Sequence, residues 1–162
     1  MAFSLLASPA LLLGVTATNQ PTNRSVTAWT EPSGGLYAST QNQGVWNETR
    51  QIDQTAEIMR VAINSEGVAA VAYTMPDGPY FFSRLYVVIL FKDSWSEPTL
   101  ISDPENENVL EIHDLSVAED NSILVNWTSA PDNYAYPIQY RAIYRDASGE
   151  WNEAIELKPL KK

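Results

Sequence analysis

Short runs of alternating apolar and polar residues recur along almost the whole chain, and turn-forming residues separate them. The runs are rich in Val, Ile, Thr, Trp and Tyr, which favour strands. Gly, Pro, Asn and Asp gather between them, as at residues 64–67. No stretch of a dozen residues keeps the apolar spacing of a helix. The pattern predicts an all-β protein with strands at 11–18, 25–30, 35–40, 46–52, 58–63, 68–74, 85–92, 95–101, 112–118, 122–128, 138–145 and 151–157.

The predicted strands fall into three similar units of four. In each unit the second strand ends in an aromatic residue followed by Thr and then a Pro-containing turn, and the fourth strand opens with Trp. The first marker stands at Trp29, Tyr73 and Trp127, and the second at Trp46, Trp95 and Trp151. Four short antiparallel strands in a repeat of about fifty residues, with a Trp in each, are typical of β-propeller blades. An aligned β-sandwich is the alternative, but it does not require three similar units.

The fold class that we expect is therefore all-β, with three four-stranded antiparallel propeller blades in one segment over residues 1–162. The blades are predicted at about 10–52, 56–102 and 110–158, and residues 1–9 as the remnant of a preceding blade's outer strand. Three blades do not close a ring of the usual size, and we expect an apolar sheet face at each end of the array. The expected partner is therefore the chain itself, in a homodimer that completes a six-bladed propeller.

The last predicted hairpin carries a motif with a family likeness. Asp146-Ala147-Ser148-Gly149-Glu150-Trp151 is similar to a degenerate Asp-box, the hairpin motif of the sialidase superfamily of β-propellers. Asp93-Ser94-Trp95 and Gly44-Val45-Trp46 keep fewer of its residues. The resemblance implies a bacterial β-propeller repeat protein and leaves a sialidase-like glycoside hydrolase as an alternative function. A sialidase needs three converging arginines, whereas only Arg60 lies near the start of an inner strand.

Composition and net charge limit the classes of partner that we expect the chain to bind. The net charge is −10 and the isoelectric point is near 4.4, so the chain repels phosphate backbones and we expect no nucleic-acid partner. The apolar start, residues 1–18, has no basic residue before Arg24 and is too short for a membrane span, so we expect neither a signal peptide nor a membrane partner. The chain has no cysteine, which leaves the compartment open, with the bacterial periplasm or exterior favoured.

Two loops between the second and third strands of a unit are the predicted ligand-binding face. They span residues 76–84 and 131–137 and combine five aromatic rings with two carboxylates. Rings beside hydrogen-bonding groups suit sugars or extended peptides. The alternative is that these rings fold over blade edges or lie at a subunit contact. The candidate ligand-binding residues of these loops are Asp77, Tyr80, Phe81, Asp132, Tyr134 and Tyr136.

Arg60 and His113 are the remaining candidates, because the starts of the inner strands line the channel mouth of a propeller. A lone His beside carboxylates is either a proton-transfer group or a satisfied structural residue. One His gives no zinc site, and the acidic run at 103–108 favours a solvated loop over a Ca²⁺ site. We expect no cofactor, metal or catalytic residue. The predicted function is a non-catalytic module that binds carbohydrate or protein, with a hydrolase or an assembly scaffold without small ligand as alternatives.

Overall fold

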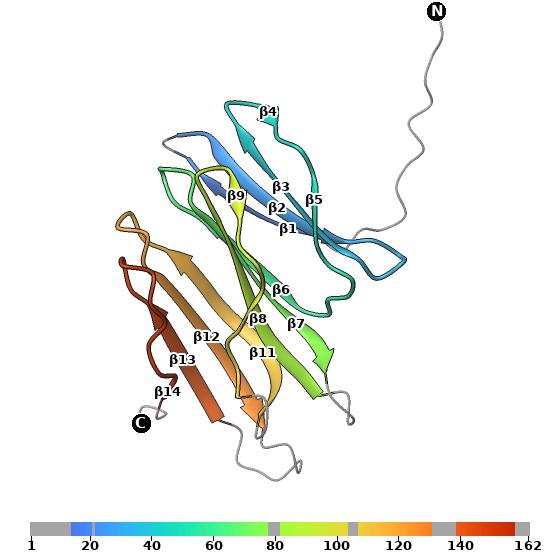
Figure 1. The fold of residues 1–162 in the computed structure, drawn as a ribbon, viewed down its shortest axis with the longest axis vertical. Coiled ribbons are helices and arrows are strands. Elements are labelled where there is room, and N and C mark those ends of the chain that lie inside the picture. The colour runs from blue at the N-terminus through green and yellow to red at the C-terminus, as the bar shows by residue number, and fades with distance from the viewer. Residues whose placement is uncertain (1–13, 21, 78–81, 104–106, 131–138, 158–162) are drawn as a thin grey trace, which may run out of the picture.

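The computed structural model describes residues 14–20, 22–77, 82–103, 107–130 and 139–157. These residues form three separate antiparallel sheets and no helix, so the prediction of an all-β chain is confirmed. Figure 1 shows the sheets side by side, the first uppermost and the third lowest. Since the described part of the chain contains strands alone, it offers no helix long or apolar enough to cross a membrane.

The first sheet runs in chain order from an inner to an outer edge. β1 pairs with β2, β2 with β3, and β3 with both β4 and β5, all antiparallel. Its strands are β1 (Gly14–Asn19), β2 (Arg24–Thr30), β3 (Leu36–Asn42), β4 (Val45–Trp46) and β5 (Arg50–Asp53).

The second sheet repeats the same order. β6 pairs with β7, β7 with β8, and β8 with both β9 and β10. Its strands are β6 (Met59–Ile63), β7 (Ala69–Asp77), β8 (Phe82–Phe91), β9 (Ser94–Trp95) and β10 (Thr99–Leu100).

The third sheet has four strands, again in chain order: β11 (Asn108–Val117), β12 (Ile123–Ala130), β13 (Gln139–Arg145) and β14 (Ile155–Glu156). The ladder between β11 and β12 shifts register twice, at residues 109–111 and 112–114. Trp151 forms an isolated bridge with Arg145 instead of opening a strand. The inner strands β1, β6 and β11 lie next to one another across the three sheets.

The outer strand of each sheet is split, whereas the sequence predicted one continuous strand. In the first sheet β4 and β5 flank a break at Asn47, where the Asn47 amide still donates to the Thr40 carbonyl at 2.8 Å and side-chain hydrogen bonds take the neighbouring positions. Asn47 Nδ2 donates to Thr40 Oγ1 at 2.8 Å, and Ser39 Oγ donates to the Asn47 carbonyl at 2.9 Å. In the second sheet Ser96 Oγ accepts a hydrogen bond from the Ile89 amide at 3.0 Å. A Ser or Asn after the Trp therefore interrupts both outer strands.

The tight hairpins before these outer strands have the expected turn chemistry. Gln43 and Gly44 have φ of 49° and 84°, and Lys92 and Asp93 have φ of 49° and 62°. Two consecutive residues with positive φ match the twist of antiparallel strands and form the tightest hairpin connections. The hairpins predicted near residues 41–45 and 93–94 are confirmed.

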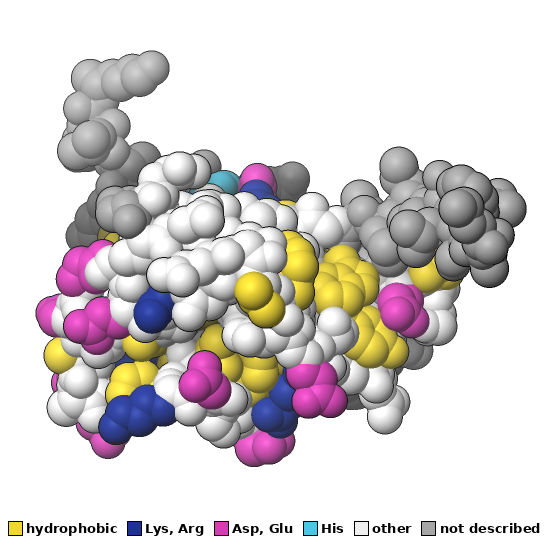
Figure 2. Space-filling model, turned by 90° about the horizontal axis from the view of Figure 1, so that it is seen from above, with side chains coloured by type: hydrophobic (Ala, Val, Ile, Leu, Met, Phe, Trp, Pro, Cys, Tyr) yellow, Lys and Arg dark blue, Asp and Glu magenta, His cyan; other side chains and the backbone are white. Residues whose placement is uncertain are grey.

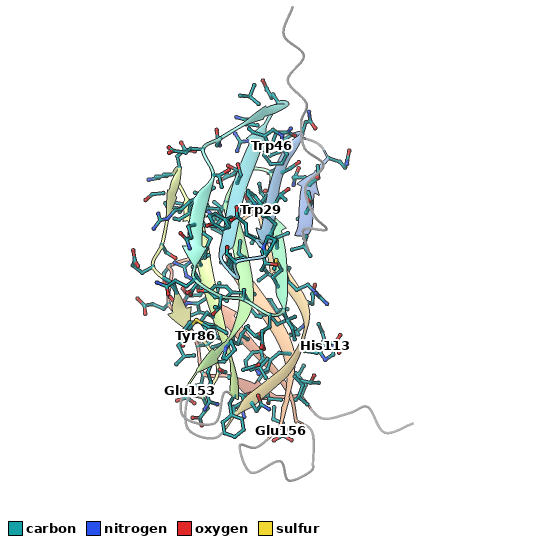
Figure 3. The ribbon with its side chains drawn as sticks, turned by 90° about the vertical axis from the view of Figure 1, so that its right-hand side faces the viewer. Trp29, Trp46, Tyr86, His113, Glu153 and Glu156 are labelled. Atoms are coloured by element: carbon teal, nitrogen blue, oxygen red, sulfur yellow. The ribbon has the colours of Figure 1, made fainter. Side chains whose placement is uncertain are left out.

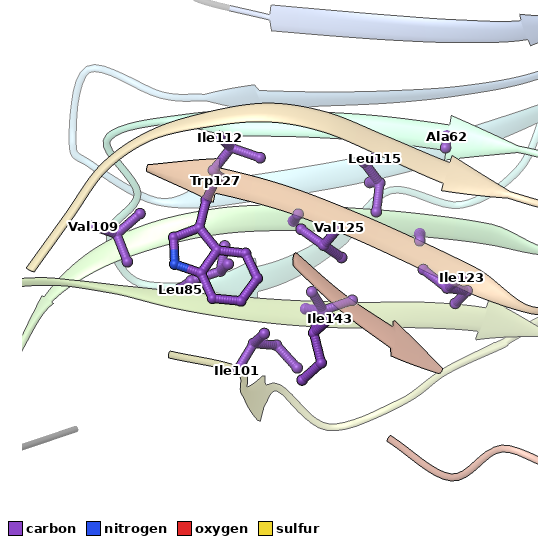
Figure 4. Packing of buried hydrophobic residues seen from close by; sticks show 13 residues of the cluster. Ala62, Leu85, Ile101, Val109, Ile112, Leu115, Ile123, Val125, Trp127 and Ile143 are labelled. Atoms are coloured by element: carbon purple, nitrogen blue, oxygen red, sulfur yellow. The ribbon is translucent and has the colours of Figure 1, made fainter. Parts of the chain in front are cut away.

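Apolar residues fill the two spaces between the sheets. Val26 and Ala28 of β2 face the second sheet, where Val71 and Tyr73 of β7 are fully buried. The other face of the second sheet meets the third, around the fully buried Trp127. Figure 4 shows Trp127 among Leu85, Val109, Ile112, Val125 and Ile143. The aromatic marker of the second and third units is thus a core residue on the face toward the preceding sheet.

The outer face of the first sheet differs from the apolar face that the sequence led us to expect. Strand alternation turns Ser25, Thr27 and Trp29 away from the second sheet. Hydroxyl groups pair across this face: Thr16 Oγ1 lies 2.9 Å from Thr27 Oγ1. From above, where the first sheet is nearest, apolar side chains form small separate patches among neutral and charged groups (Figure 2). This end face is mixed: hydroxyls stand where the second sheet carries Ala69 and Val71, beside the stacked aromatic rings of Trp29 and Tyr37.

Candidate functional site

The loop residues predicted to bind a ligand lie outside the described part of the chain. Tyr80, Phe81, Asp132, Tyr134 and Tyr136 are not described. Asp77 is described through its backbone alone, which ends β7 opposite Phe82. Binding by these loops stays a prediction.

Arg60 and His113 lie on the neighbouring inner strands β6 and β11. Arg60 is half-buried, and its guanidinium donates to the Met59 carbonyl at 3.0 Å. His113 is exposed, and its Nδ1 lies 3.9 Å from Glu111 Oε2. Figure 3 places His113 at one edge of the molecule, on the side away from Tyr86. His113 therefore faces solvent beside one carboxylate, in no enclosed site.

Glu107 is a buried carboxylate at the boundary of the second and third sheets. The sequence favoured a solvated acidic loop here, which is wrong for this residue: Glu107 is only 2% exposed. Its Oε1 accepts from Trp127 Nε1 at 2.7 Å and lies 3.5 Å from Arg141 Nε, and its Oε2 accepts from the Asp103 amide at 2.9 Å. Protein donors therefore occupy both carboxylate oxygens. Glu107 is placed to join the sheets rather than to hold Ca²⁺.

Tyr73 makes the corresponding link between the first two sheets. Its hydroxyl donates to Asp53 Oδ2 at 2.7 Å. Burial, followed by the hydrogen bond and the charge of Asp53, raises the pKa of Tyr73 well above its ordinary value. The Tyr73 hydroxyl is therefore held protonated as a donor and is a structural group.

A hollow lies among the described residues at the end of β8 opposite the Asp77–Phe82 pair. It is about 560 Å³ in volume and opens between the first two sheets, beside the turn at residues 64–67 and the β8–β9 hairpin. Arg24 lines this hollow, and its guanidinium donates a hydrogen bond to the Glu66 carbonyl. Its lining residues are Arg24, Thr40, Gln41, Asn42, Asn47, Ile63, Glu66, Gly67, Val68, Leu90, Phe91, Lys92, Asp93 and Asn121.

A second hollow of about 520 Å³ continues the first along the outer edge of the sheets. Thr40, Asn47, Leu90 and Asp93 line both, so the two form one depression, which we call the hairpin-end groove. The second part adds Glu48, Thr49, Arg50, Gln51, Ser94 and Trp95.

The chemistry of the hairpin-end groove is mostly neutral and polar. Thr40, Asn42 and Thr49 contribute hydroxyl and amide groups to its lining, and Phe91, which is 47% exposed, contributes an aromatic ring. Such groups both donate and accept hydrogen bonds. The cations of the groove are already engaged: Lys92 Nζ lies 5.1 Å from the centre of the Phe91 ring. Likewise, Arg50 Nη1 donates to the Trp95 carbonyl at 3.3 Å.

Two further carboxylates, those of Asp146 and Asp120, accept hydrogen bonds within turns. Asp146 Oδ1 accepts from the amides of Ser148, Gly149 and Glu150 and from the Ser148 hydroxyl, and these bonds lower the pKa of Asp146. Ser122 likewise lowers the pKa of Asp120. Both keep their charge to order a hairpin. Within the described ranges, no three His, Asp or Glu side chains come together as metal ligands.

Sequence reasoning missed the hairpin-end groove because its walls come from turns of different sheets. Arg24, Asn47 and Asp93 are each ordinary strand-end or hairpin residues in the sequence, and only the stacking of the sheets brings them together.

No protein-family model matches the chain, and none of the curated proteins matches it in sequence.

Proposed function

We propose that the three sheets are β-propeller blades and that the chain is a non-catalytic module that binds carbohydrate in the hairpin-end groove. Three meanders in the same strand order, with the inner strands β1, β6 and β11 side by side, support the blade arrangement. The shared repeat markers in the sequence support it independently.

The observation that carries the binding proposal is the continuity of the two hollows across Thr40, Asn47, Leu90 and Asp93. Together they form an elongated depression on the scale of small-molecule sites. An elongated ligand with several hydroxyls would meet amide and hydroxyl partners along its length and an aromatic ring at one end. Those are the contacts that a short oligosaccharide needs.

A carbohydrate is favoured over an anionic ligand because the groove's charges balance. Arg24, Arg50 and Lys92 are offset by Glu48, Glu66 and Asp93 in the same lining. Arg50 also lies 3.9 Å from Glu97, so its charge is partly neutralised from outside the groove. A strongly anionic ligand would meet as many carboxylates as cations in this lining, whereas a neutral sugar would meet no net charge.

Isothermal titration with a panel of neutral oligosaccharides tests the proposal, alongside a chromogenic-glycoside assay. Asn42→Ala and Thr49→Ala should each weaken binding about 2- to 10-fold, the value of one hydrogen bond. Thr55→Ala is the matched control, since Thr55 is an exposed threonine outside the groove. Binding that the groove variants weaken, without turnover, supports the module. Turnover would make the chain a hydrolase, and silence in both assays would leave an assembly scaffold.

A further inference from the structure

Three aromatic residues of the second sheet form its contact with the first. Tyr73 and Tyr86 are directly opposite on β7 and β8 and stack with ring centres 5.8 Å apart. Trp95 stands opposite Leu90, four residues beyond Tyr86 on β8. All three pack against clusters that contain Val26, Ala28 or Leu36 of the first sheet.

The first sheet carries aromatic residues at the same three register positions. Trp29 and Tyr37 are directly opposite on β2 and β3 and stack at 6.1 Å. Trp46 stands opposite Gln41, again four residues beyond the aromatic of the third strand. These three side chains lie on the outer face of the first sheet, and Trp46 is 52% exposed. Figure 3 shows Trp29 and Trp46 along that sheet, with Tyr86 on the sheet below.

The Tyr73 hydroxyl and the Trp127 indole nitrogen, at the positions equivalent to Trp29, show which group contacts this face in the second and third sheets. Tyr73 donates to Asp53, and Trp127 donates to Glu107. In both cases the carboxylate follows the outer strands of the preceding sheet. Within the described ranges, Trp29 has no such acceptor. The outer face of the first sheet thus carries aromatic residues at the same positions as the face of the second sheet that contacts the first. It therefore forms one half of an equivalent interface.

The outer face of the third sheet offers the other half. Ile155 pairs with Ala142, as Arg50 pairs with Ala38 on the face of the first sheet that covers the second. Ile155 and Leu157 are 59% and 40% exposed, although both are large apolar residues. Asp114 and Asn126 are paired on the same face and supply hydrogen-bond acceptors.

We infer that this chain associates head to tail, with the outer face of the third sheet of one copy covering Trp29, Tyr37 and Trp46 of the next. The inference rests on the proposed blade arrangement. Contact between two third sheets would bring Glu111 and Asp114 against their own copies, and like charges repel. Head-to-tail contact instead sets those carboxylates against hydroxyls and the Trp29 indole. Two copies then close a ring of six blades, a usual number.

Multi-angle light scattering across the micromolar range should give two chain masses of 18.0 kDa for the unaltered chain. Trp46→Arg and Ile155→Arg should each give one chain mass, because a charge then sits inside the interface. Both residues are exposed in the single chain, so each variant should keep a cooperative melt. Leu100→Arg is the matched control: Leu100 is 37% exposed on the middle sheet, both of whose faces are covered within the chain. It should stay dimeric.

Mixing Trp46→Arg with Ile155→Arg distinguishes head-to-tail contact from contact between like faces. Each variant keeps the face that the other has lost, so an equimolar mixture should form a one-to-one complex through a single interface. A monomeric unaltered chain, a dimer that survives Trp46→Arg, or a mixture that stays monomeric would each overturn the inference. Oligosaccharide titration of Trp46→Arg keeps the two proposals separate, because the hairpin-end groove does not include Trp46.

Discussion

The hydroxyl of Tyr73 donates to Asp53 Oδ2 at 2.7 Å and so joins a fully buried strand of the second sheet to the end of the first. The indole of Trp127 makes the equivalent bond to Glu107, also at 2.7 Å. A repeated apolar core with one polar link at each boundary accounts for the alignment of three separate sheets, because a buried donor and acceptor must meet to avoid the cost of an unmade bond.

Removing the first of these links should destabilise the chain. Tyr73→Phe keeps the ring and deletes the donor, which leaves Asp53 with one partner fewer. We expect the free energy of unfolding in urea to fall by about 1–2 kcal/mol. Tyr37→Phe, which removes a hydroxyl opposite Trp29 on the outer face of the first sheet, should change it by less than about 0.5 kcal/mol. Equal losses in the two variants would contradict a special role for the Tyr73–Asp53 bond.

The raised pKa of Tyr73 sets the direction of the alkaline response. An unfolded Tyr ionises near pH 10, whereas the folded Tyr73 holds its proton to higher pH. The contribution of this group is therefore fully present below about pH 10 and is lost as pH rises toward the folded pKa. The free energy of unfolding should fall above that pH, and more steeply for the unaltered chain than for Tyr73→Phe. Parallel curves for the two proteins would contradict this assignment.

Glu107 should be one of the most sensitive positions in the chain. Glu107→Ala removes the buried acceptor of the Trp127 indole and the charge that pairs with Arg141, and we expect a loss of about 3–5 kcal/mol. Glu107→Gln keeps an oxygen that accepts from Trp127, so its loss should be smaller. Urea unfolding followed by Trp fluorescence measures both. Two variants within the error of the unaltered chain would show that the carboxylate is dispensable to the packing of the third sheet.

Asp146 should titrate below an ordinary Asp, because its carboxylate accepts three amides and one hydroxyl in the β13–Trp151 turn. Carbon-detected NMR during an acid titration follows this side chain directly. Ser148→Ala removes the hydroxyl, the largest cause of the lowered pKa of Asp146, and should move that pKa upward toward the ordinary value of an Asp. An unchanged titration would mean that the turn is not organised by this bond.

The sequence predicted the sheets better than the outer strands. Alternation around Ala28, Val71 and Val125 identified strands whose inward-facing side chains at these positions are fully buried. The split outer strands were missed because Asn47 and Ser96 compete with the ladder through side-chain hydrogen bonds, which strand propensity does not register.

The candidate site was harder to predict, because it depends on contacts between units. Asp93 and Asn47 are distant in sequence and meet only after the sheets stack. Glu107 resembles any acid in an acidic run, and only the buried indole of Trp127 makes it a core residue. The sequence repeat does predict part of these contacts, because Tyr73 and Trp127 occupy the same position in their units and each donates a hydrogen bond to a carboxylate.

The most direct test of the proposed binding function is a map of where a carbohydrate binds. Amide chemical shifts of the labelled chain, followed during titration with the best oligosaccharide of the panel, locate the contact without any substitution. We predict that the largest changes fall on Thr40, Asn47, Leu90 and Asp93 in the hairpin-end groove. Changes confined to residues 77–81 and 131–138 would contradict the groove as the binding site.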